Sequence, residues 1–281
     1  MADLDAIERT ALLTAALRAA ESRRPDRLYA DPYAAAFAGD LGPKLLAEVR
    51  AVTFPATGRT LPSTPDYNAI RTRFFDEYLV EAAREVDQLV VAPSGMDSRA
   101  FRLPWPRRVR LFEVDRPAVL AVKEEILGSA VPAVGRRTVA TDLKDDGWER
   151  PLLAAGYEPD RPSAWLIEGL LYYIPEPDVH RILGTVRELT APGSLVAADV
   201  VNRAALTLPN MRGLLDVFAG WGCPWLFGSD EPEDLFARYG IKAEAVQPGE
   251  PAADYGRWPD PVPPRSVTEV RRVFFVHGTR V

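Results

Sequence analysis

Hydrophobic residues recur with a helical period in the N-terminal part of the chain. Apolar residues such as Leu13 and Leu17 are spaced by three or four positions there, which predicts amphipathic helices. The helices are expected at 10–20, 31–37, 43–49 and 68–85. The segment 53–65 is rich in proline, threonine and glycine, and it is expected to be a loop.

From Gln88 onward, short apolar runs bounded by turn residues replace this pattern and predict buried strands. The expected strands are 88–92, 109–114, 137–140, 163–167, 194–201 and 270–276. Helical segments lie between them at 117–127, 148–155 and 177–189. This alternation predicts an α/β fold with a doubly wound, mostly parallel sheet that helices cover on both faces. Ligands bind such sheets beyond the carboxyl ends of the strands.

Acids stand at the ends of three expected strands, at Asp115, Asp142 and Glu168. The first strand ends in a turn that contains Gly95, which lets the backbone approach a ligand closely. Asp115 lies 20 residues after Gly95, where the hydroxyls of an adenosine ribose would be held. A plain strand-to-helix turn with Asp115 as the N-cap of the next helix explains the same spacing. The spacing alone therefore leaves nucleotide-like binding open.

Composition argues against several classes of protein. The chain of 281 residues has a formal net charge of −6 and lacks the basic excess of a nucleic-acid binder, so no such partner is expected. One cysteine and two histidines are too few for a disulfide framework or a Cys/His zinc site, and no metal is expected. The sequence contains no apolar run of about 18 residues, so no membrane span is expected. The N-terminus lacks the pattern of a signal peptide, so a cytoplasmic location is expected.

Five short motifs follow one another along the chain. They are Asn68-Ala69-Ile70-Arg71-Thr72-Arg73-Phe74-Phe75-Asp76, Asp97-Ser98-Arg99-Ala100-Phe101-Arg102-Leu103, Phe112-Glu113-Val114-Asp115-Arg116-Pro117 with Lys123 beyond it, Asp142-Leu143, and Glu168-Gly169-Leu170-Leu171-Tyr172-Tyr173. In this order they resemble the leucine carboxyl methyltransferase family, especially its bacterial branch of S-adenosylmethionine-dependent small-molecule O-methyltransferases. The resemblance runs from about Thr10 to the C-terminus and is thin after Val201.

The resemblance implies the class I fold of S-adenosylmethionine-dependent methyltransferases, with N-terminal helices and a helical lid insertion. One domain is expected over 1–281, with a helical cap region at 1–85 and a lid or substrate insertion at 202–240. The resemblance implies S-adenosylmethionine as the cofactor and a small-molecule acceptor as the partner. The chain is expected to be a monomer or a homodimer.

The resemblance also implies roles for individual residues. Those expected to bind the cofactor are Arg71, Gly95, Asp97, Asp115, Asp142, Leu143 and Glu168. Arg71 would pair with the carboxylate of the methionine part, and Asp115 would hold the ribose hydroxyls. Asp142 and Leu143 would flank the adenine. Glu168 would face the amino group of the methionine part, and with Tyr173, close to the transferred methyl, it is a catalytic candidate.

Structural alternatives stand beside these roles. Arg71 and Arg73 could pair with Asp76 or Glu77 on the same helix. Asp142 could be a turn residue, and Tyr173 could be a core aromatic. Glu168 follows an apolar run, where an acid needs a partner or has a raised pKa. Three other residues are interpreted as structural or solvated: Arg99, Arg102 and His180.

The chain departs from the family at the first loop, where Pro93-Ser94-Gly95 replaces the usual Gly-Ala-Gly. Proline has no backbone N–H and fixes φ near −65°, so Pro93 cannot copy a glycine with positive φ. The loop either tolerates this or is reshaped. An alternative function follows, in which the chain has lost methyl transfer and catalyses a cyclisation or an elimination, or only binds a ligand.

The expected reaction is methyl transfer to a carboxyl or acidic hydroxyl of a small metabolite, such as a polyketide-derived acid. A carboxylate is already ionised and needs no general base, which suits a chain with two histidines outside the motifs. The acceptor pocket is expected between the N-terminal helices and the apolar residues of 204–239. Cys223 is given no catalytic role, since no base accompanies it. The proline-rich stretch 248–264 is expected to be a surface wrap or a partner-facing loop.

Overall fold

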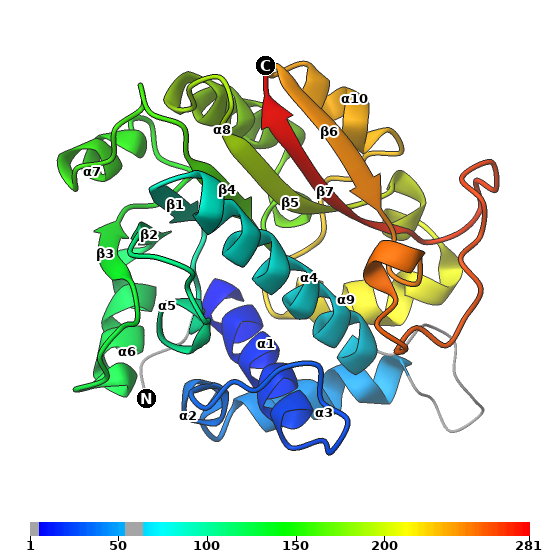
Figure 1. Cartoon of the computed structure of the whole chain (residues 1–281). Helices are drawn as coiled ribbons and strands as arrows, with labels where there is room; N and C mark the ends of the chain where they lie inside the picture. Colours follow the sequence, from blue (N-terminus) through cyan, green and yellow to red (C-terminus); the bar gives the residue numbers. More distant parts are fainter. Residues whose placement is uncertain (1–5, 54–63) are drawn as a thin grey trace.

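A seven-stranded sheet forms the centre of the computed structural model, which describes residues 6–53 and 64–281 (Figure 1). Most of the loop expected at 53–65 lies outside the described residues. The sheet order is β3-β2-β1-β4-β5-β7-β6. The strands are β1 (Gln88–Val91), β2 (Arg110–Asp115), β3 (Gly135–Ala140), β4 (Ala164–Ile167), β5 (Leu195–Val201), β6 (Ile241–Val246) and β7 (Val273–Arg280).

Neighbouring strands from β1 to β5 pair in parallel, and β7 is antiparallel to both β5 and β6. The prediction of a mostly parallel, doubly wound sheet is confirmed. The strand order reverses between β1 and β4, and at such a switch point a crevice opens beyond the strand ends. The sequence pattern did not predict β6, because this edge strand carries Lys242 and Glu244 and is only partly buried.

Helices cover both faces of the sheet and one of its ends. They are α1 (Ala6–Ser22), α2 (Ala34–Ala38), α3 (Gly42–Thr53), α4 (Thr64–Glu85), α5 (Arg99–Arg102), α6 (Pro117–Leu127), α7 (Glu149–Ala154), α8 (Glu176–Leu189), α9 (Arg212–Gly220) and α10 (Pro232–Ala237). The short 3₁₀ turns are η1 (Leu171–Tyr173), η2 (Arg203–Leu206), η3 (Pro209–Met211) and η4 (Pro251–Ala253). In Figure 1, α4 runs diagonally across the sheet, and α1 to α3 gather at one end.

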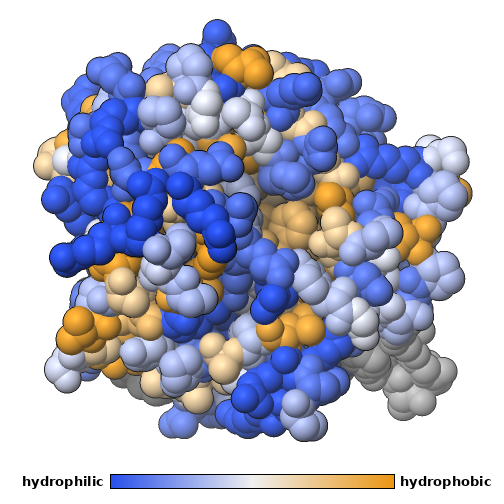
Figure 2. All heavy atoms as spheres, viewed as in Figure 1, coloured by the Kyte–Doolittle hydropathy of each residue, from blue (hydrophilic) through white to orange (hydrophobic). Residues whose placement is uncertain are grey.

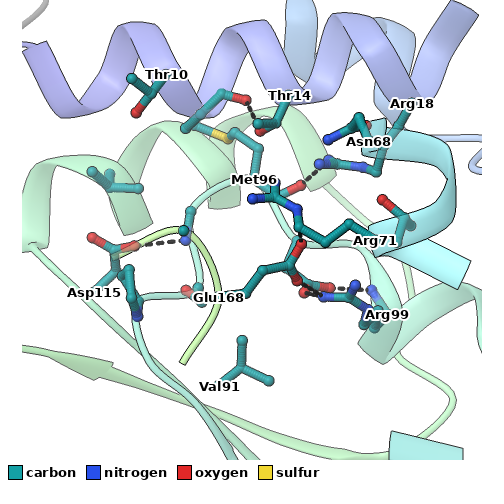
Figure 3. A pocket seen from close by; sticks show the side chains of 18 of the residues that line it. Thr10, Thr14, Arg18, Asn68, Arg71, Val91, Met96, Arg99, Asp115 and Glu168 are labelled. Atoms are coloured by element: carbon teal, nitrogen blue, oxygen red, sulfur yellow. Dashed lines mark hydrogen bonds and ion pairs between the residues drawn. The ribbon is translucent and has the colours of Figure 1, made fainter. Parts of the chain in front are cut away.

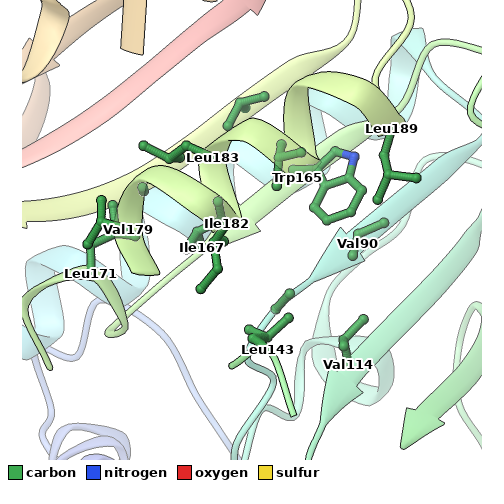
Figure 4. Packing of buried hydrophobic residues seen from close by; sticks show 14 of the residues in the cluster. Val90, Val114, Leu143, Trp165, Ile167, Leu171, Val179, Ile182, Leu183 and Leu189 are labelled. Atoms are coloured by element: carbon green, nitrogen blue, oxygen red, sulfur yellow. The ribbon is translucent and has the colours of Figure 1, made fainter. Parts of the chain in front are cut away.

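The buried strands send alternate side chains into two different cores. On one face, Val90 and Trp165 pack with Ile182 and Leu183 of α8, as Figure 4 shows. On the other face, the neighbouring strand residues pack with α4, through Ile70, Phe75 and Leu79 among others. A strand with both faces buried reads as a continuous apolar run, which is why β1, β4 and β5 were visible in the sequence.

A third core joins α1, α2 and α3 to α9 and to the inner side of α6. The segment 202–240 divides between two places, because α9 belongs to this third core whereas Leu235 and Phe236 of α10 pack in the core that contains α8. Hydrophilic residues predominate on the face shown in Figure 2, where hydrophobic residues form only small groups. No helix within the described residues is long and apolar enough to cross a membrane.

The proline-rich stretch after β6 is an ordered wrap. Ala253 of η4 is buried in the same core as α4, and the Arg272 guanidinium donates to the carbonyls of Pro263, Pro264 and Val267. These contacts favour the surface wrap over the partner-facing loop, the two interpretations that the sequence left open for 248–264.

A buried ion pair connects β2 to α6 within the third sequence motif. The Lys123 Nζ atom lies 2.7 Å from Glu113 Oε2, and both residues are at most 1% exposed. Arg136 of β3 approaches the same oxygen at 2.8 Å. Glu113 and Lys123 of this motif therefore have a structural role, since they form a buried ion pair together with Arg136.

Replacing Lys123 with methionine is expected to lower the free energy of unfolding by about 3 kcal/mol, because a buried carboxylate loses one of its two cations. Urea unfolding measures the change. Lys44→Met, at an exposed site on α3, is the control and is expected to change stability by less than about 0.5 kcal/mol. A Lys123→Met protein as stable as the control would show that Arg136 alone satisfies Glu113.

Candidate functional site

A cleft opens beyond the carboxyl ends of β1, β2 and β4, under α1 and the first half of α4 (Figure 3). We call it the main cleft. It is lined by Thr10, Ala11, Thr14, Arg18, Asn68, Arg71, Thr72, Val91, Pro93, Ser94, Gly95, Met96, Asp97, Arg99, Arg102, Asp115, Val119, Glu168, Gly169, Tyr172 and Tyr173. The structure thus brings six of the expected site residues into one cavity: Arg71, Gly95, Asp97, Asp115, Glu168 and Tyr173.

The loop after β1 is held against the end of β2. Gly95 has a φ of +45°, a conformation that favours glycine, while a Cβ there would meet only Ala11 at 3.6 Å. The N–H of Gly95 donates to Asp115 Oδ2 at 2.6 Å, and the N–H of Arg116 donates to Oδ1 at 2.7 Å. Burial raises the pKa of Asp115, although these two N–H groups act in the opposite direction. The N-cap of α6 is Arg116, so the alternative of Asp115 as N-cap is wrong.

Pro93 lies in the wall of the main cleft, after a cis peptide bond with Ala92. The next two N–H groups are used inside the protein, since Ser94 donates to the carbonyl of Val114 and Gly95 donates to Asp115. Gly95 keeps its positive φ despite the proline two positions earlier. Side chains, more than loop amides, are thus the polar groups that this cleft presents to a ligand.

Glu168 is held between two arginines. Its Oε1 lies 3.0 Å from Arg71 Nε, at ion-pair distance but without hydrogen-bond alignment, and its Oε2 accepts from Arg99 Nη1 at 2.8 Å. The expectation that an acid after an apolar strand needs a partner is met by these contacts. Figure 3 shows Arg71 and Arg99 approaching the carboxylate from different elements.

Arg71 also binds Asp199 in the middle of β5, a residue that the sequence analysis missed. Asp199 is fully buried, and its Oδ2 accepts from Arg71 Nη1 at 2.9 Å and from Tyr67 at 3.2 Å. Its Oδ1 accepts from the N–H of Gly169 at 2.6 Å. The same-helix alternative for Arg71 is therefore wrong, whereas Arg73 does pair with Glu77 on α4. The sequence signal for Asp199 is a single acid inside an otherwise apolar strand.

Arg99 and Arg102 tie the second motif to the first. Both bind Asp76 of α4, Arg99 through Nε at 2.7 Å and Arg102 through two nitrogens at 2.6 and 2.7 Å. These contacts agree with the structural interpretation of both arginines. Arg99 further binds Asp97, whose carboxylate lines the main cleft. Burial would raise the pKa of Asp97, but Arg99 and two more distant cations lower it to about 2.

A side pocket continues the main cleft toward β3 and contains the remaining expected residues. Asp142 and Leu143 line it together with Asp115, Gly169 and Tyr173, which also line the main cleft. The carboxylate of Asp142 accepts from the N–H of Lys144 at 2.9 Å, so Asp142 is a turn residue as well as part of the wall.

Cys223 lines the side pocket, and the structure gives no sign of a nucleophile there. Its thiol donates to the carbonyl of Phe218 at 3.3 Å, and burial raises its pKa to about 11. His180 was interpreted as solvated, which is wrong in part: it is partly buried, and its Nδ1 lies 2.6 Å from the hydroxyl of Tyr239. His180 lies outside the residues that line the cleft and the side pocket.

An apolar chamber adjoins the main cleft on the side of α1 and α9. It is lined by Thr10, Leu13, Thr14, Leu17, Tyr67, Asn68, Arg71, Tyr172, Tyr173, Val201, Leu214, Phe218, Trp225, Arg271 and Val273. Tyr173 belongs to the main cleft, the side pocket and the chamber. The chamber lies between the N-terminal helices and the insertion, where the sequence analysis expects the acceptor pocket.

Three polar α1 residues in the cleft wall, Thr10, Thr14 and Arg18, were also missed by the sequence analysis. Arg18 binds Asp31 at 2.9 Å and the carbonyl of Met96, which fixes α1 over the loop after β1. Their contribution depends on how α1 lies on the sheet, for which the sequence has no local signal. Residues 6–53 and 64–281 contain no cluster of three or more His, Cys, Asp or Glu side chains that could hold a metal ion.

The model of a protein family described as leucine carboxyl methyltransferase matches residues 11–187, which include the whole cleft except Thr10. The chain belongs to the leucine carboxyl methyltransferase family. A relative from Parafrankia sp. (strain EAN1pec), named "Putative S-adenosyl-L-methionine-dependent methyltransferase", is 42% identical over 76% of this chain and 72% of its own length. A relative of the same name from Saccharopolyspora erythraea is 38% identical over 88% of each chain.

The fold is shared with solved structures. The crystal structure of a "putative methyltransferase" from Thermobifida fusca YX superposes with a TM-score of 0.62 over 96% of this chain and 94% of the other, at 18% identity. At this identity the likeness shows the fold alone. It agrees with the class I methyltransferase fold that the motifs implied, and the family that the motifs resemble is confirmed by the family match.

Asp97→Asn is expected to lower the free energy of unfolding by about 2 kcal/mol near pH 6, because the fold lowers the pKa of Asp97 to about 2 and so stabilises its charged form. A carboxyl with a lowered pKa adds stability above its unfolded pKa and loses it as the pH falls through the folded value. The difference between the wild type and Asp97→Asn should therefore disappear between about pH 4 and pH 2. Urea unfolding across this range measures it, with Asp216→Asn at an exposed site of α9 as the control. If the free energies of unfolding of the wild type and of Asp97→Asn changed equally with pH, the lowered pKa of Asp97 would be contradicted.

Proposed function

We propose that this protein is an S-adenosyl-L-methionine-dependent O-methyltransferase acting on a carboxyl or acidic hydroxyl of a small, largely apolar metabolite. The observation that carries the proposal is the continuity of the cavities. A polar cleft at the switch point of the sheet meets an apolar chamber, and Tyr173 lines both. A methyl donor and an acceptor need this kind of adjoining pair of sites.

The polar groups of the cleft fit the cofactor. Two buried side-chain atoms in its wall, Asn68 Oδ1 and Ser94 Oγ, have no hydrogen-bond partner among the described residues. S-adenosylmethionine carries an ammonium, a carboxylate, two ribose hydroxyls and an adenine, so it can satisfy such atoms. Arg71 would hold the carboxylate and Glu168 the ammonium group. The strand-end acid Asp115 would hold the hydroxyls.

The remaining expected residues complete the binding site. Asp142 and Leu143 would flank the adenine in the side pocket, and Gly95 would let the loop pass close to the cofactor. Asp97, held by Arg99, would lie at the edge of the cleft. The names of the relatives support a methyl donor, since both are described as S-adenosyl-L-methionine-dependent methyltransferases.

When bound, S-adenosylmethionine supplies a methyl group on a positively charged sulfur. The chain has to align the acceptor oxygen with that methyl and keep water away. Tyr173 is placed for this role where the cavities meet, with its ring 5.9 Å from that of Phe218 on α9. The region 1–85 would act as the cap and α9, within 202–240, as the wall of the acceptor site, since Leu214 and Phe218 face the chamber.

Among the described residues of the main cleft and the chamber, each carboxylate is already bound to an arginine or to backbone N–H groups, which leaves none well suited to removing a proton from a weakly acidic hydroxyl. Burial raises the pKa of Tyr172 and of Tyr173, so both hydroxyls stay protonated, and that of Tyr172 donates to Asp199. Neither histidine belongs to the walls of the main cleft or the chamber. Asp199 is fully buried and bound to Arg71. An acceptor that is already ionised, above all a carboxylate, suits these surroundings.

The alternative of a chain that has lost methyl transfer depends on Pro93. Gly95 retains a positive φ and Asp115 still receives its N–H, so the loop keeps the acid at the end of β2 in place. These features favour methyl transfer over the cofactor-free reactions and over binding alone.

Asp115→Asn is expected to weaken the binding of S-adenosylmethionine and of S-adenosylhomocysteine by about tenfold or more, because hydrogen bonds to a carboxylate contribute about 1.5–3 kcal/mol. Isothermal titration calorimetry measures both ligands. Asp216→Asn should bind like the wild type, and thermal unfolding confirms that the variants are folded. Absence of binding to the folded wild type would refute the proposed function.

The acceptor group can be identified from the product. We expect radioactive methyl from labelled S-adenosylmethionine to appear on small apolar carboxylic acids, and mild base to release it as methanol, because an ester hydrolyses readily whereas an aryl ether does not. Phenols matched to the acids in size serve as the comparison. Label that survives the base treatment would contradict a carboxyl acceptor and point to a hydroxyl. No incorporation with any acid or phenol, despite cofactor binding, would favour the alternative of lost methyl transfer.

A further inference from the structure

Two consecutive arginines before β7 have opposite surroundings. Arg272 is buried and donates to Gln247 and to the backbone carbonyls of Pro263, Pro264 and Val267, so its guanidinium is used to fix the loop. Arg271 lies on the other side of this extended segment and lines the apolar chamber beside Tyr67 and Val273. Neighbouring residues of an extended chain point in opposite directions, which accounts for the difference.

Among the described residues, Arg271 has no acidic partner. No carboxylate within residues 6–53 and 64–281 lies within ion-pair distance of it, and its one neighbour of electrostatic weight is the hydroxyl of Tyr67. Arg71, the other arginine of the chamber wall, is bound to Glu168 and Asp199. A partly buried cation without a counter-charge is unfavourable unless a ligand completes it. Burial also lowers the pKa of Arg271, yet a guanidinium stays protonated in proteins.

Most of the chamber wall around Arg271 is apolar or aromatic. Its wall includes Leu13, Leu17, Leu214, Phe218 and Trp225. Arg271 is absent from the wall of the main cleft, where Arg71 and Tyr173 meet both cavities. The free positive charge is thus placed in the acceptor chamber, away from the part of the site that the cofactor would occupy.

We propose that Arg271 is a specificity residue that binds an anionic group, most simply a carboxylate, of an apolar or aromatic acceptor. The inference rests on the proposed function, because that function makes the chamber the acceptor site. The bound anion is a different group from the one that receives the methyl. An arginine paired with the attacking oxygens would withdraw their electron density, and Arg271 lies outside the main cleft. The substrate class is therefore an apolar molecule with an anionic group at the end remote from the methylated oxygen.

The test compares 2-naphthoate with its neutral counterpart 2-naphthamide, by calorimetry in the presence of S-adenosylhomocysteine. The wild type is expected to bind the acid about tenfold more tightly than the amide, since a charge-assisted pair contributes at least that much. Arg271→Gln should lose this preference while its affinity for the amide stays within about twofold. Arg271→Lys should keep part of the preference, because it retains the charge without the planar fork.

Arg187→Gln on the exposed side of α8 removes the same charge far from the chamber and should behave like the wild type. Equal binding of acid and amide by the wild type, or binding of neither, overturns the inference. A preference that persists in Arg271→Gln also overturns it. The proposed function fails separately, if S-adenosylhomocysteine does not bind the wild type. The affinity for S-adenosylhomocysteine should be the same in Arg271→Gln as in the wild type. If this variant lost the binding of S-adenosylhomocysteine and of the naphthalene probes equally, its fold would be damaged and a specificity role would be contradicted.

Discussion

The pairing of buried charges around Glu168 is the constraint on which the site depends. A carboxylate at the end of a buried strand is costly without cations, and Arg71 and Arg99 supply them from α4 and α5. The same two arginines bind Asp199 and Asp76, so the network ties β4, β5, α4 and α5 together near the carboxyl ends of the strands. Removing one member would leave a buried charge without its counterpart. The shape of the cleft and the stability of this part of the fold are therefore coupled.

The central strands were predictable because both of their faces are buried. In β4, and in β1 after Gln88, each side chain meets one of the two cores, so the apolar run is continuous. The edge strand β6 has no such run, and its place is determined by pairing with β7. The polar half of β7 from His277 to Arg280 stays in the sheet because β5 and β6 flank it on both sides. Partners this far away in the chain leave no local pattern.

The residues of the site likewise divide into those that the sequence reveals and those that depend on tertiary packing. Asp115 and Glu168 could be found from the sequence, since the topology of a parallel sheet collects strand ends at one edge. Asp199 lies within a strand, and Thr10 reaches the cleft only through the packing of α1, so tertiary contacts decide their roles. Arg271 and Arg272 are adjacent and chemically identical, yet one fixes a loop and the other faces a chamber. Residue type alone cannot separate them.

The departure at Pro93 becomes intelligible from the hydrogen bonds of its loop. The N–H groups of Ser94 and Gly95 are both used within the protein, by Val114 and Asp115. A proline at 93 removes one more donor from a loop that offers few to a ligand. The groups that give the cleft its chemistry are side chains on β2, β4 and α4, and these do not depend on the backbone at 93. The proline therefore affects how closely the loop approaches a ligand, while the acids and arginines that recognise it remain in place.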